Sequence, residues 1–211
     1  MPAAQRVSLI KECGVDLVID VGANTGQYAK ALRARGFTGR IQSFEPLPDA
    51  FAELLAAAGN DPNWEVRNEA LGPMNAQIEF NVSGDGVCSS PLLATAGLTT
   101  SIPQSTTVGT TTVSQARLDE VALPAERVLL KIDTQGYEHH VLDGATQTLS
   151  RTVALDVEMA LVELYEGGSS IYDLLPRLHR EGFSVVSIES GFVDPRTSQT
   201  LDVDVLLIRN E

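Results

Sequence analysis

A short stretch near the amino terminus, LVIDVGANTG at residues 17–26, combines an apolar run with a carboxylate and two glycines. The run from Leu17 to Val21 predicts a strand buried on both faces, and the residues from Gln27 onwards predict the start of a helix. Between them, Gly22 and Gly26 let the backbone approach a ligand closely, because a Cβ there would collide with it. A strand, a glycine turn and a helix N-terminus in this order are typical of a nucleotide-like cofactor site in an open α/β sheet.

Four carboxylates are expected at the carboxyl ends of strands, where such a sheet binds its ligands. Asp20 ends the first predicted strand, Glu45 the second, Asp133 the fourth and Glu158 the fifth. Glu45 follows the glycine turn by about 20 residues, the position from which a carboxylate accepts hydrogen bonds from ribose hydroxyls. Two plainer interpretations stay open: Asp20 could cap the following helix, and Glu45 could be a solvated loop residue.

Three features favour S-adenosylmethionine (SAM) over a dinucleotide as the cofactor. The turn is G-A-N-T-G rather than GxGxxG, so no pyrophosphate cradle is evident. The carboxylate of Asp20 would repel a pyrophosphate but suits the ammonium group of a methionine moiety. Two strands near the carboxyl end, at 183–188 and 202–208, are joined by too short a connection for a crossover helix, so they should be antiparallel. That arrangement is typical of SAM-dependent methyltransferases.

The elements that must position these residues alternate along the chain. We expect one α/β domain over residues 1–211, with a Rossmann-like seven-stranded sheet that is mostly parallel and has an antiparallel C-terminal strand. Residues 83–107 form a long Gly-, Ser-, Thr- and Pro-rich stretch, which predicts a substrate or lid loop. Residues 1–15 are expected to form an N-terminal helical segment. The predicted strands are 16–21, 40–44, 64–70, 77–82, 110–113, 127–132, 152–158, 183–188 and 202–208, and the main helices are 25–35, 48–58, 137–149 and 169–181.

Composition excludes several classes of partner. The 211-residue chain has a net charge of −13 and no Lys/Arg-rich patch, so nucleic acid and anionic membranes are poor partners. No apolar run reaches the roughly 18–20 residues that span a bilayer, and the amino terminus lacks the apolar core of a signal peptide. The expected location is therefore cytoplasmic. Cys13 and Cys88 are expected to be free thiols.

Four motifs together resemble the FkbM family of SAM-dependent methyltransferases. They are DVGANTGQYA at 20–29, SFEP at 43–46, NEALG at 68–72 and KIDTQGYEHHVLDGA at 131–145, in the family's order. The resemblance implies O-methylation of hydroxyls, often on secondary metabolites, macrolides or sugars. It also implies a set of cofactor contacts, with the turn at the methionine end, Glu45 at the ribose and residues 69–70 near the adenine. The expected contacts are Asp20, Gly22, Ala23, Asn24, Gly26, Gln27, Glu45, Pro46, Glu69, Ala70 and Asp133.

Transfer of a methyl group to a hydroxyl requires a positioned oxygen and a group that takes its proton. Asp133 is the first candidate for this site role, Glu158 the second and His139 the third. His139 and His140 are adjacent in the predicted helix and point about 100° apart, so at most one of them faces the site. In a metal-assisted version, Asp133 and Glu158 would hold Mg²⁺, although no third ligand stands out.

The sequence therefore predicts an O-methyltransferase that acts on a hydroxyl of a small molecule, secondary metabolite, sugar or glycan. Two alternatives stay open: an NAD(P)-binding oxidoreductase or epimerase, and a non-catalytic SAM-binding module. The sequence leaves open which acceptor is used, which residue is the base and whether the protein forms a homo-oligomer.

Overall fold

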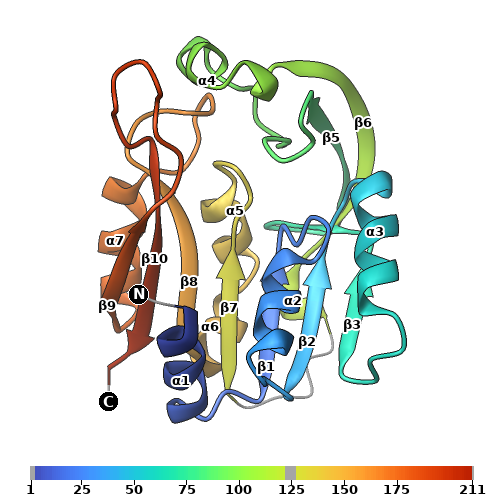
Figure 1. Ribbon diagram of the computed structural model, residues 1–211, viewed down its shortest axis with the longest axis vertical. Helices are drawn as coiled ribbons and strands as arrows, with labels where there is room; N and C mark the ends of the chain where they lie inside the picture. Colours follow the sequence, from blue (N-terminus) through green and yellow to red (C-terminus); the bar gives the residue numbers. More distant parts are fainter. Residues whose placement is uncertain (1–2, 122–126, 211) are drawn as a thin grey trace.

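A seven-stranded mixed sheet organises the protein, as seen in a computed structural model that describes residues 3–121 and 127–210 (Figure 1). The strand order is β3-β2-β1-β7-β8-β10-β9, and only β10 runs antiparallel to its neighbours. The predicted fold class, including the antiparallel C-terminal strand, is confirmed. The strands are β1 (Leu17–Val21), β2 (Arg40–Phe44), β3 (Trp64–Arg67), β7 (Val128–Ile132), β8 (Thr152–Ala160), β9 (Phe183–Ser190) and β10 (Asp202–Arg209).

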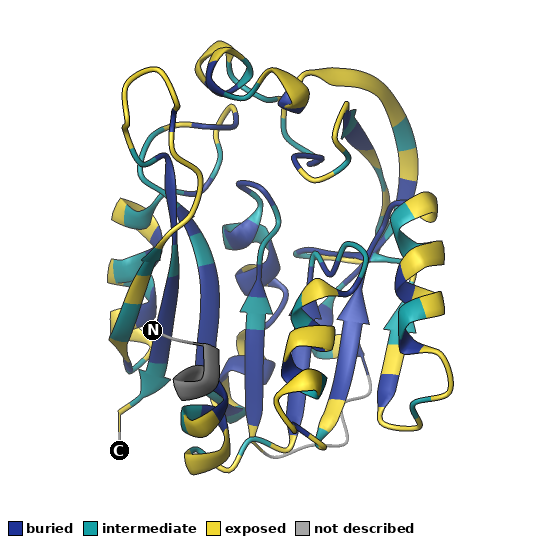
Figure 2. Cartoon of the chain, viewed as in Figure 1, coloured by how far each residue is buried: buried dark blue, intermediate teal, exposed yellow. Residues whose placement is uncertain are grey.

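Helices cover both faces of this sheet. The first face is covered by α1 (Ala3–Glu12), α2 (Gln27–Ala34) and α3 (Pro48–Ala58), which share one apolar cluster with Val18 and Leu129. The second face is covered by α5 (Glu138–Asp143), α6 (Thr146–Arg151) and α7 (Ile171–Arg180), which share another cluster with Ile19 and Leu130. Consecutive residues of β1 therefore enter opposite cores, and the central strands are buried along their length (Figure 2). This explains why the run at 17–21 is continuously apolar around Asp20.

A second, three-stranded sheet lies beside the first and differs from the prediction. Its order is β4-β6-β5, formed by β4 (Ala70–Leu71), β5 (Ala76–Ser83) and β6 (Thr107–Ala116). The predicted strand at 64–70 is thus two strands in different sheets, and the short strand expected at 110–113 is ten residues long. Its threonine-rich sequence favours a strand but carries little apolar alternation, and its pairing with β5 is what defines its length.

The single helix predicted at 137–149 is also wrong, because the chain breaks into α5 and α6 around Gly144. A Cβ at Gly144 would overlap the carbonyl oxygen of Gly72, so the chain turns where two backbones meet. Asp119, in the short helix η2 (Leu118–Glu120), then caps α6 from outside: its oxygens accept hydrogen bonds from the backbone of Gln147 at 3.0 Å and Thr148 at 2.8 Å.

The segment at 83–107 is more structured than a loop. It contains the helix α4 (Ala96–Ser101) and the short helix η1 (Pro103–Ser105), and it passes over the carboxyl ends of the strands in Figure 1. The part of the segment around α4 is held to the β8 side of the large sheet. Thr95 N donates to the carbonyl oxygen of Leu164 at 2.9 Å, and Ser101 Oγ donates to Asp194 Oδ2 at 2.9 Å. The segment therefore bridges the two sheets above the strand ends. No helix among the described residues is long and apolar enough to cross a membrane.

Candidate active site

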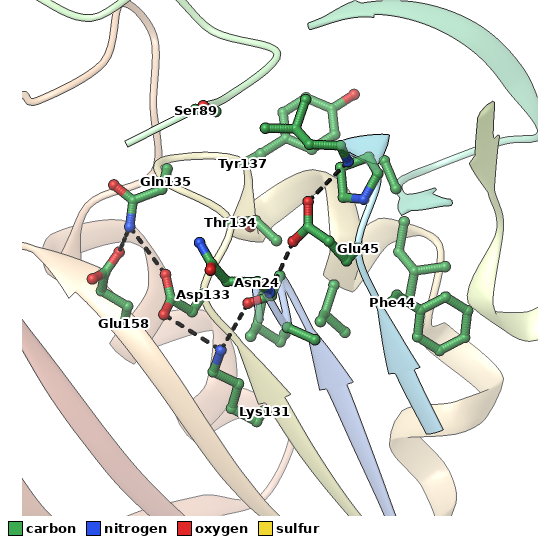
Figure 3. Close-up of a pocket in the computed structure, with 18 of the residues that line it drawn as sticks. Asn24, Phe44, Glu45, Ser89, Lys131, Asp133, Thr134, Gln135, Tyr137 and Glu158 are labelled. Carbon is green, nitrogen blue, oxygen red and sulfur yellow. Dashed lines mark hydrogen bonds and ion pairs between the residues drawn. The ribbon is translucent and has the colours of Figure 1, made fainter. Parts of the chain in front are cut away.

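One cavity of about 410 Å³ opens at the carboxyl ends of β1, β2, β7 and β8, beneath the bridging segment. Figure 3 shows Phe44 and Glu45 facing it from one side and Gln135 and Glu158 from the other. Nine of the eleven expected cofactor contacts line the cavity. They are Gly22, Ala23, Asn24, Gln27, Glu45, Pro46, Glu69, Ala70 and Asp133.

The glycine turn shapes one edge of this cavity. Gly22 has a φ of 72°, and a Cβ there would overlap the carbonyl oxygen of Asp133, so the turn and the end of β7 touch. Asn24 also adopts a left-handed conformation, with a φ of 48°, and its Oδ1 accepts a hydrogen bond from Thr25 N at 2.7 Å. Gly26 does not reach the cavity; it precedes α2 and lies against Leu54 and Trp64.

Glu45 is locked in place by the backbone. Its Oε2 accepts a hydrogen bond from Asn24 N at 2.9 Å, and its Oε1 accepts one from Leu47 N at 2.9 Å. Burial raises the pKa of Glu45 to about 7, against the opposing effect of these two bonds. Each oxygen retains a lone pair, so the carboxylate can still accept bonds from two hydroxyl groups of a ligand.

The remaining wall beside Glu45 is largely apolar. Glu69 lines the cavity as expected, and its Oε2 lies 2.8 Å from Arg67 Nε in an ion pair. The neighbouring surface can hold a flat aromatic group, because hydrophobic side chains gather there. These side chains are Phe44, Leu47, Ala70, Leu71 and Phe80.

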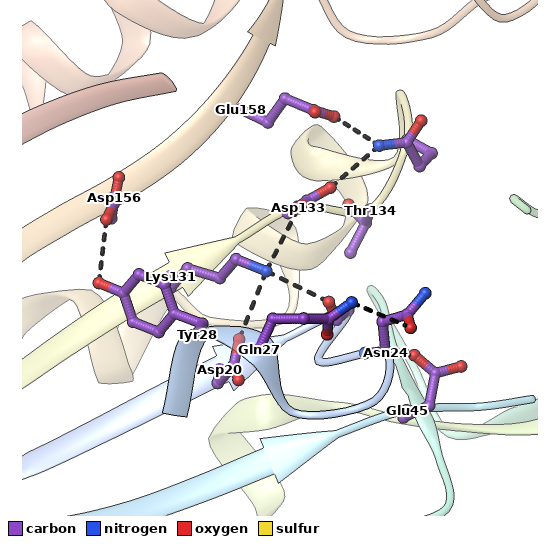
Figure 4. Close-up of polar contacts among 12 residues, drawn as sticks. Asp20, Asn24, Gln27, Tyr28, Glu45, Lys131, Asp133, Thr134, Asp156 and Glu158 are labelled. Atoms are coloured by element: carbon purple, nitrogen blue, oxygen red, sulfur yellow. Dashed lines mark hydrogen bonds and ion pairs between the residues drawn. The ribbon is translucent and has the colours of Figure 1, made fainter. Parts of the chain in front are cut away.

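Asp20 lies beneath the cavity rather than in its wall. It is fully buried, and its Oδ1 lies 3.4 Å from Lys131 Nζ, whose other carboxylate partner is Asp133 Oδ2 at 3.3 Å (Figure 4). Burial opposes the positive charge, but Asp133 and Asp20 together raise the pKa of Lys131. Asp20 therefore holds an ammonium group of the protein itself, which replaces the direct ligand contact that its position in the sequence suggested.

Asp133 and Glu158 come together on the opposite wall. Gln135 Nε2 donates to Asp133 Oδ1 at 3.0 Å and to Glu158 Oε2 at 2.7 Å, and it thereby bridges the two carboxylates. Burial, and then the nearby charge of Asp133, raise the pKa of Glu158 well above its usual value. The bond from Gln135 uses Glu158 Oε2, which leaves Oε1 of a carboxylate with a raised pKa for a ligand in the cavity that Glu158 lines.

Sequence reasoning missed the group that orients Gln135. The hydroxyl of Tyr165 lies 2.7 Å from Gln135 Oε1 and 3.0 Å from the carbonyl oxygen of Cys88, two acceptors for its single hydrogen. With Oε1 on the side of Tyr165, the amide nitrogen of Gln135 faces the two carboxylates, which accept its hydrogens. Ser90 Oγ also donates to the carbonyl oxygen of Gln135 at 2.8 Å. The only signal in the sequence is the T-Q-G stretch itself. In the structure, Gln135 has a left-handed backbone conformation there, with a φ of 55°, directly before Gly136.

The structure does not bring His139 to the cavity. Its backbone nitrogen donates to Ser169 Oγ, and its ring Nδ1 lies 3.0 Å from Arg177 Nη1 on α7. Burial and the charge of Arg177 lower the pKa of His139. The preceding Glu138 accepts hydrogen bonds from Thr134 N and Gly136 N, as expected for a carboxylate at a helix start. His139 is thus not among the residues that line the cavity, although the pKa of a histidine made it a candidate for taking up a proton there.

The described residues contain no group of three or more His, Cys, Asp or Glu side chains that could hold a metal ion. Asp133 and Glu158 are bridged by an amide nitrogen, which is a hydrogen-bond donor and not a metal ligand. The residues present therefore do not fit the Mg²⁺ site considered from the sequence.

Comparisons with known proteins agree with this geometry. The sequence pattern of the Methyltransferase FkbM domain matches residues 20–185. The 2-O-methyltransferase NoeI of Sinorhizobium fredii is 30% identical over 189 residues, which cover 82% of this chain and 75% of that protein. The hexuronic acid methyltransferase AglP of Haloferax volcanii is 27% identical over 72% of this chain and 57% of its own.

A solved structure supports the fold. The crystal structure of methyltransferase FkbM from Methylobacillus flagellatus has a TM-score of 0.56 at 14% identity, and the match covers 92% of this chain and 43% of that one. This chain thus spans three quarters of the rhizobial protein and less than two thirds of the other two.

Proposed function

The chain belongs to the FkbM methyltransferase family, and we propose that it transfers the methyl group of SAM to a hydroxyl of a sugar or glycan. The observation that carries the proposal is the position of Glu158. This carboxylate of raised pKa lines the same cavity as the glycine turn and has one oxygen free for an acceptor. Both relatives named above are methyltransferases, and one of the names specifies a hexuronic acid.

Three groups of lining residues support SAM as the cofactor. The apolar side chains, which include Phe44 and Leu71, suit an adenine ring. Glu45 is held with both oxygens toward the turn and suits the ribose diol. The amide groups of Asn24 and Gln27 and the carboxylate of Asp133 suit the carboxylate and ammonium groups of the methionine end.

Glu158 would serve as the general base. When bound, SAM supplies a methyl group made electrophilic by its sulfonium. In the transfer, the acceptor oxygen would bond to the methyl carbon as the carbon–sulfur bond breaks, and the electron pair of that bond would stay on sulfur. Glu158 Oε1 takes the hydroxyl proton, which its raised pKa favours. Gln135 holds the other oxygen, so the base keeps its orientation.

Two other functions are less well supported. An NAD(P) enzyme would need a pyrophosphate cradle, and the turn has Asp20 and Lys131 packed directly beneath it instead. A non-catalytic SAM-binding module would need no carboxylates at the transfer point, yet both Asp133 and Glu158 line the cavity.

Calorimetric titration tests the cofactor first. We expect S-adenosylhomocysteine (SAH), the demethylated product, to bind with a dissociation constant well below 1 mM, which corresponds to more than about 4 kcal/mol. NAD and NADP should give no measurable heat at the same concentrations. The reverse order of affinity would contradict the methyltransferase proposal, whatever the acceptor.

A further inference from the structure

The cavity has a second wall that the cofactor contacts do not use. It is formed by the ends of β7, β8 and β10 and by the bridging segment, and it faces the side that carries Glu45 (Figure 3). If SAM occupies the Glu45 side, the acceptor must contact this second wall, which we call the acceptor wall. Its polar residues beyond the expected cofactor contacts include Ser89, Thr134, Gln135, Glu158 and Asp204.

The hydrogen-bond donors of the acceptor wall are already engaged. Both hydrogens of Gln135 Nε2 go to carboxylates, and Thr134 Oγ1 donates to Glu138 at 3.1 Å. Ser83 Oγ donates its single hydrogen to Asp85 at 2.7 Å, so in its 3.1 Å contact with Ser89 the hydrogen comes from Ser89. The side chains of this wall therefore present mainly hydrogen-bond acceptors to a ligand, and few hydrogen-bond donors.

The charges follow the same pattern. Six carboxylates line the cavity, those of Glu45, Glu69, Asp133, Asp156, Glu158 and Asp204. Among the described lining residues, Lys131 is the one basic side chain. Its side chain is 12% exposed and is paired with Asp20 and Asp133. Its ammonium group also donates to the carbonyl oxygen of Gly22 at 3.2 Å. An anion on the acceptor would thus meet like charge in a partly dry site, where such contacts are costly.

We propose that the acceptor wall selects a sugar that carries hydroxyl or amino groups there and rejects one that carries a carboxylate, sulfate or phosphate. This inference rests on the proposed function and narrows its substrate class. It also separates the chain from the archaeal relative, whose name specifies a hexuronic acid. A hydroxyl or ammonium group can donate to Glu158 Oε1, because Gln135 bonds to the other oxygen of that carboxylate. An acidic group would find, among the described residues that line the cavity, no basic side chain other than the paired Lys131.

The test uses matched acceptors that differ only at one position. Methyl glycosides of glucose, glucosamine and glucuronic acid form one set, and the corresponding galactose and mannose compounds form two more. Transfer from radiolabelled SAM is measured for each compound, with SAH binding measured separately by calorimetry. We expect kcat/KM for the neutral or amino member to exceed that for the uronic acid at least about tenfold, by an amount that shrinks as salt screens the charges.

A charge introduced at the rim gives a second measurement. Val87 lines the cavity and is 46% exposed, so Val87→Arg adds a cation to the acceptor side without disturbing a core. The ratio of neutral to uronic acid transfer should then fall severalfold. Val108→Arg is the matched control, because Val108 is 69% exposed on β6 and does not line the cavity; it should leave the ratio unchanged.

The outcomes distinguish the proposed function from the inference about the acceptor wall. Failure to bind SAH would overturn the proposed function itself. Normal SAH binding with equal or faster transfer to the uronic acids would overturn only the inference about the acceptor wall. Normal SAH binding without transfer to any member of the three sets would also overturn it, because the acceptor would then not be a sugar of this kind.

Discussion

At the scale of single residues, Glu158 has the geometry of a base and His139 does not. Replacing Glu158 by Gln preserves the side-chain shape and removes the group that takes the proton. We expect kcat for methyl transfer to fall about 10²- to 10⁴-fold. SAH affinity measured by calorimetry should change little, because Glu158 lies on the wall opposite Glu45 (Figure 3).

His139→Ala is the natural comparison for that experiment. The His139 ring packs beside Arg177 of α7, away from the cavity lining, so this variant should retain wild-type kcat. A large loss in His139→Ala together with an active Glu158→Gln would reverse the assignment of the base.

Glu45 is the second residue with a defined expectation. Glu45→Ala should weaken SAH binding by about 1.5–3 kcal/mol, the cost of losing hydrogen bonds to a charged acceptor. Because the pKa of Glu45 is raised to about 7, wild-type affinity should also decline as the pH falls from 8 to 6 and the carboxylate is protonated. Calorimetry at both pH values checks this, with Glu65→Ala as control, since Glu65 lies exposed on β3 outside the cavity. Unchanged binding in Glu45→Ala would mean that the ribose is held elsewhere.

At the scale of elements, short sequence patterns predicted the features that depend on residues close together in the chain. The turn at 22–27 and the carboxylates at the ends of β2, β7 and β8 are in place because strand ends and glycines have direct signatures in sequence. Lys131 pairs with Asp20, its register partner on the adjacent strand β1, and with Asp133, which follows it by two residues at the end of β7. In contrast, the role of Gln135 depends on Tyr165, which is distant in sequence and lies beside it because β8 pairs with β7.

Contacts between segments distant in sequence also explain where the predicted elements were wrong. The β5–β6 pair has few apolar positions of its own, and its core consists of Phe80 and Val113 packed with Leu47 and Ala70 from other segments. The break between α5 and α6 likewise depends on Gly72 and Asp119, which are distant in sequence. A helical pattern cannot reveal a contact that lies outside the helix.

The external cap of α6 gives a prediction at this scale. The Asp119 side chain is 2% exposed and also accepts hydrogen bonds from the hydroxyls of Thr146 and Thr148, both at 3.0 Å. Asp119→Ala should therefore lower the free energy of unfolding by about 1–2 kcal/mol, at the upper end for a lost cap, as measured by urea denaturation. Asp143→Ala, at the exposed end of α5, removes a surface ion pair with Arg177 and should cost less than about 1 kcal/mol. Equal losses in both variants would show that the cap does not stabilise the break.

At the scale of the whole molecule, the buried carboxylates near the active site oppose folding at neutral pH. Burial raises the pKa of Glu138 to about 7, as it does for Glu45, from ordinary values near 4.5. Between these values the folded chain binds more protons than the unfolded chain, so stability falls as the pH rises toward 7. His139 and His140 act oppositely and at lower pH, because burial lowers the pKa of each below 6.5.

Glu138→Gln isolates this effect. The amide oxygen can accept the bonds that Glu138 Oε1 takes from Thr134 and Gly136, while the buried charge is removed. Wild-type Tm, followed by calorimetry, should fall between pH 6 and pH 8, and the fall should be smaller in Glu138→Gln. Glu166→Gln, at an exposed position, should follow the wild-type curve. Parallel curves for wild type and Glu138→Gln would mean that Glu138 does not become ionised in this window. The buried carboxyl group of Glu138 would then stay protonated at neutral pH, and protonation would limit the negative charge near the site in addition to the pairing of Lys131 with Asp20 and Asp133.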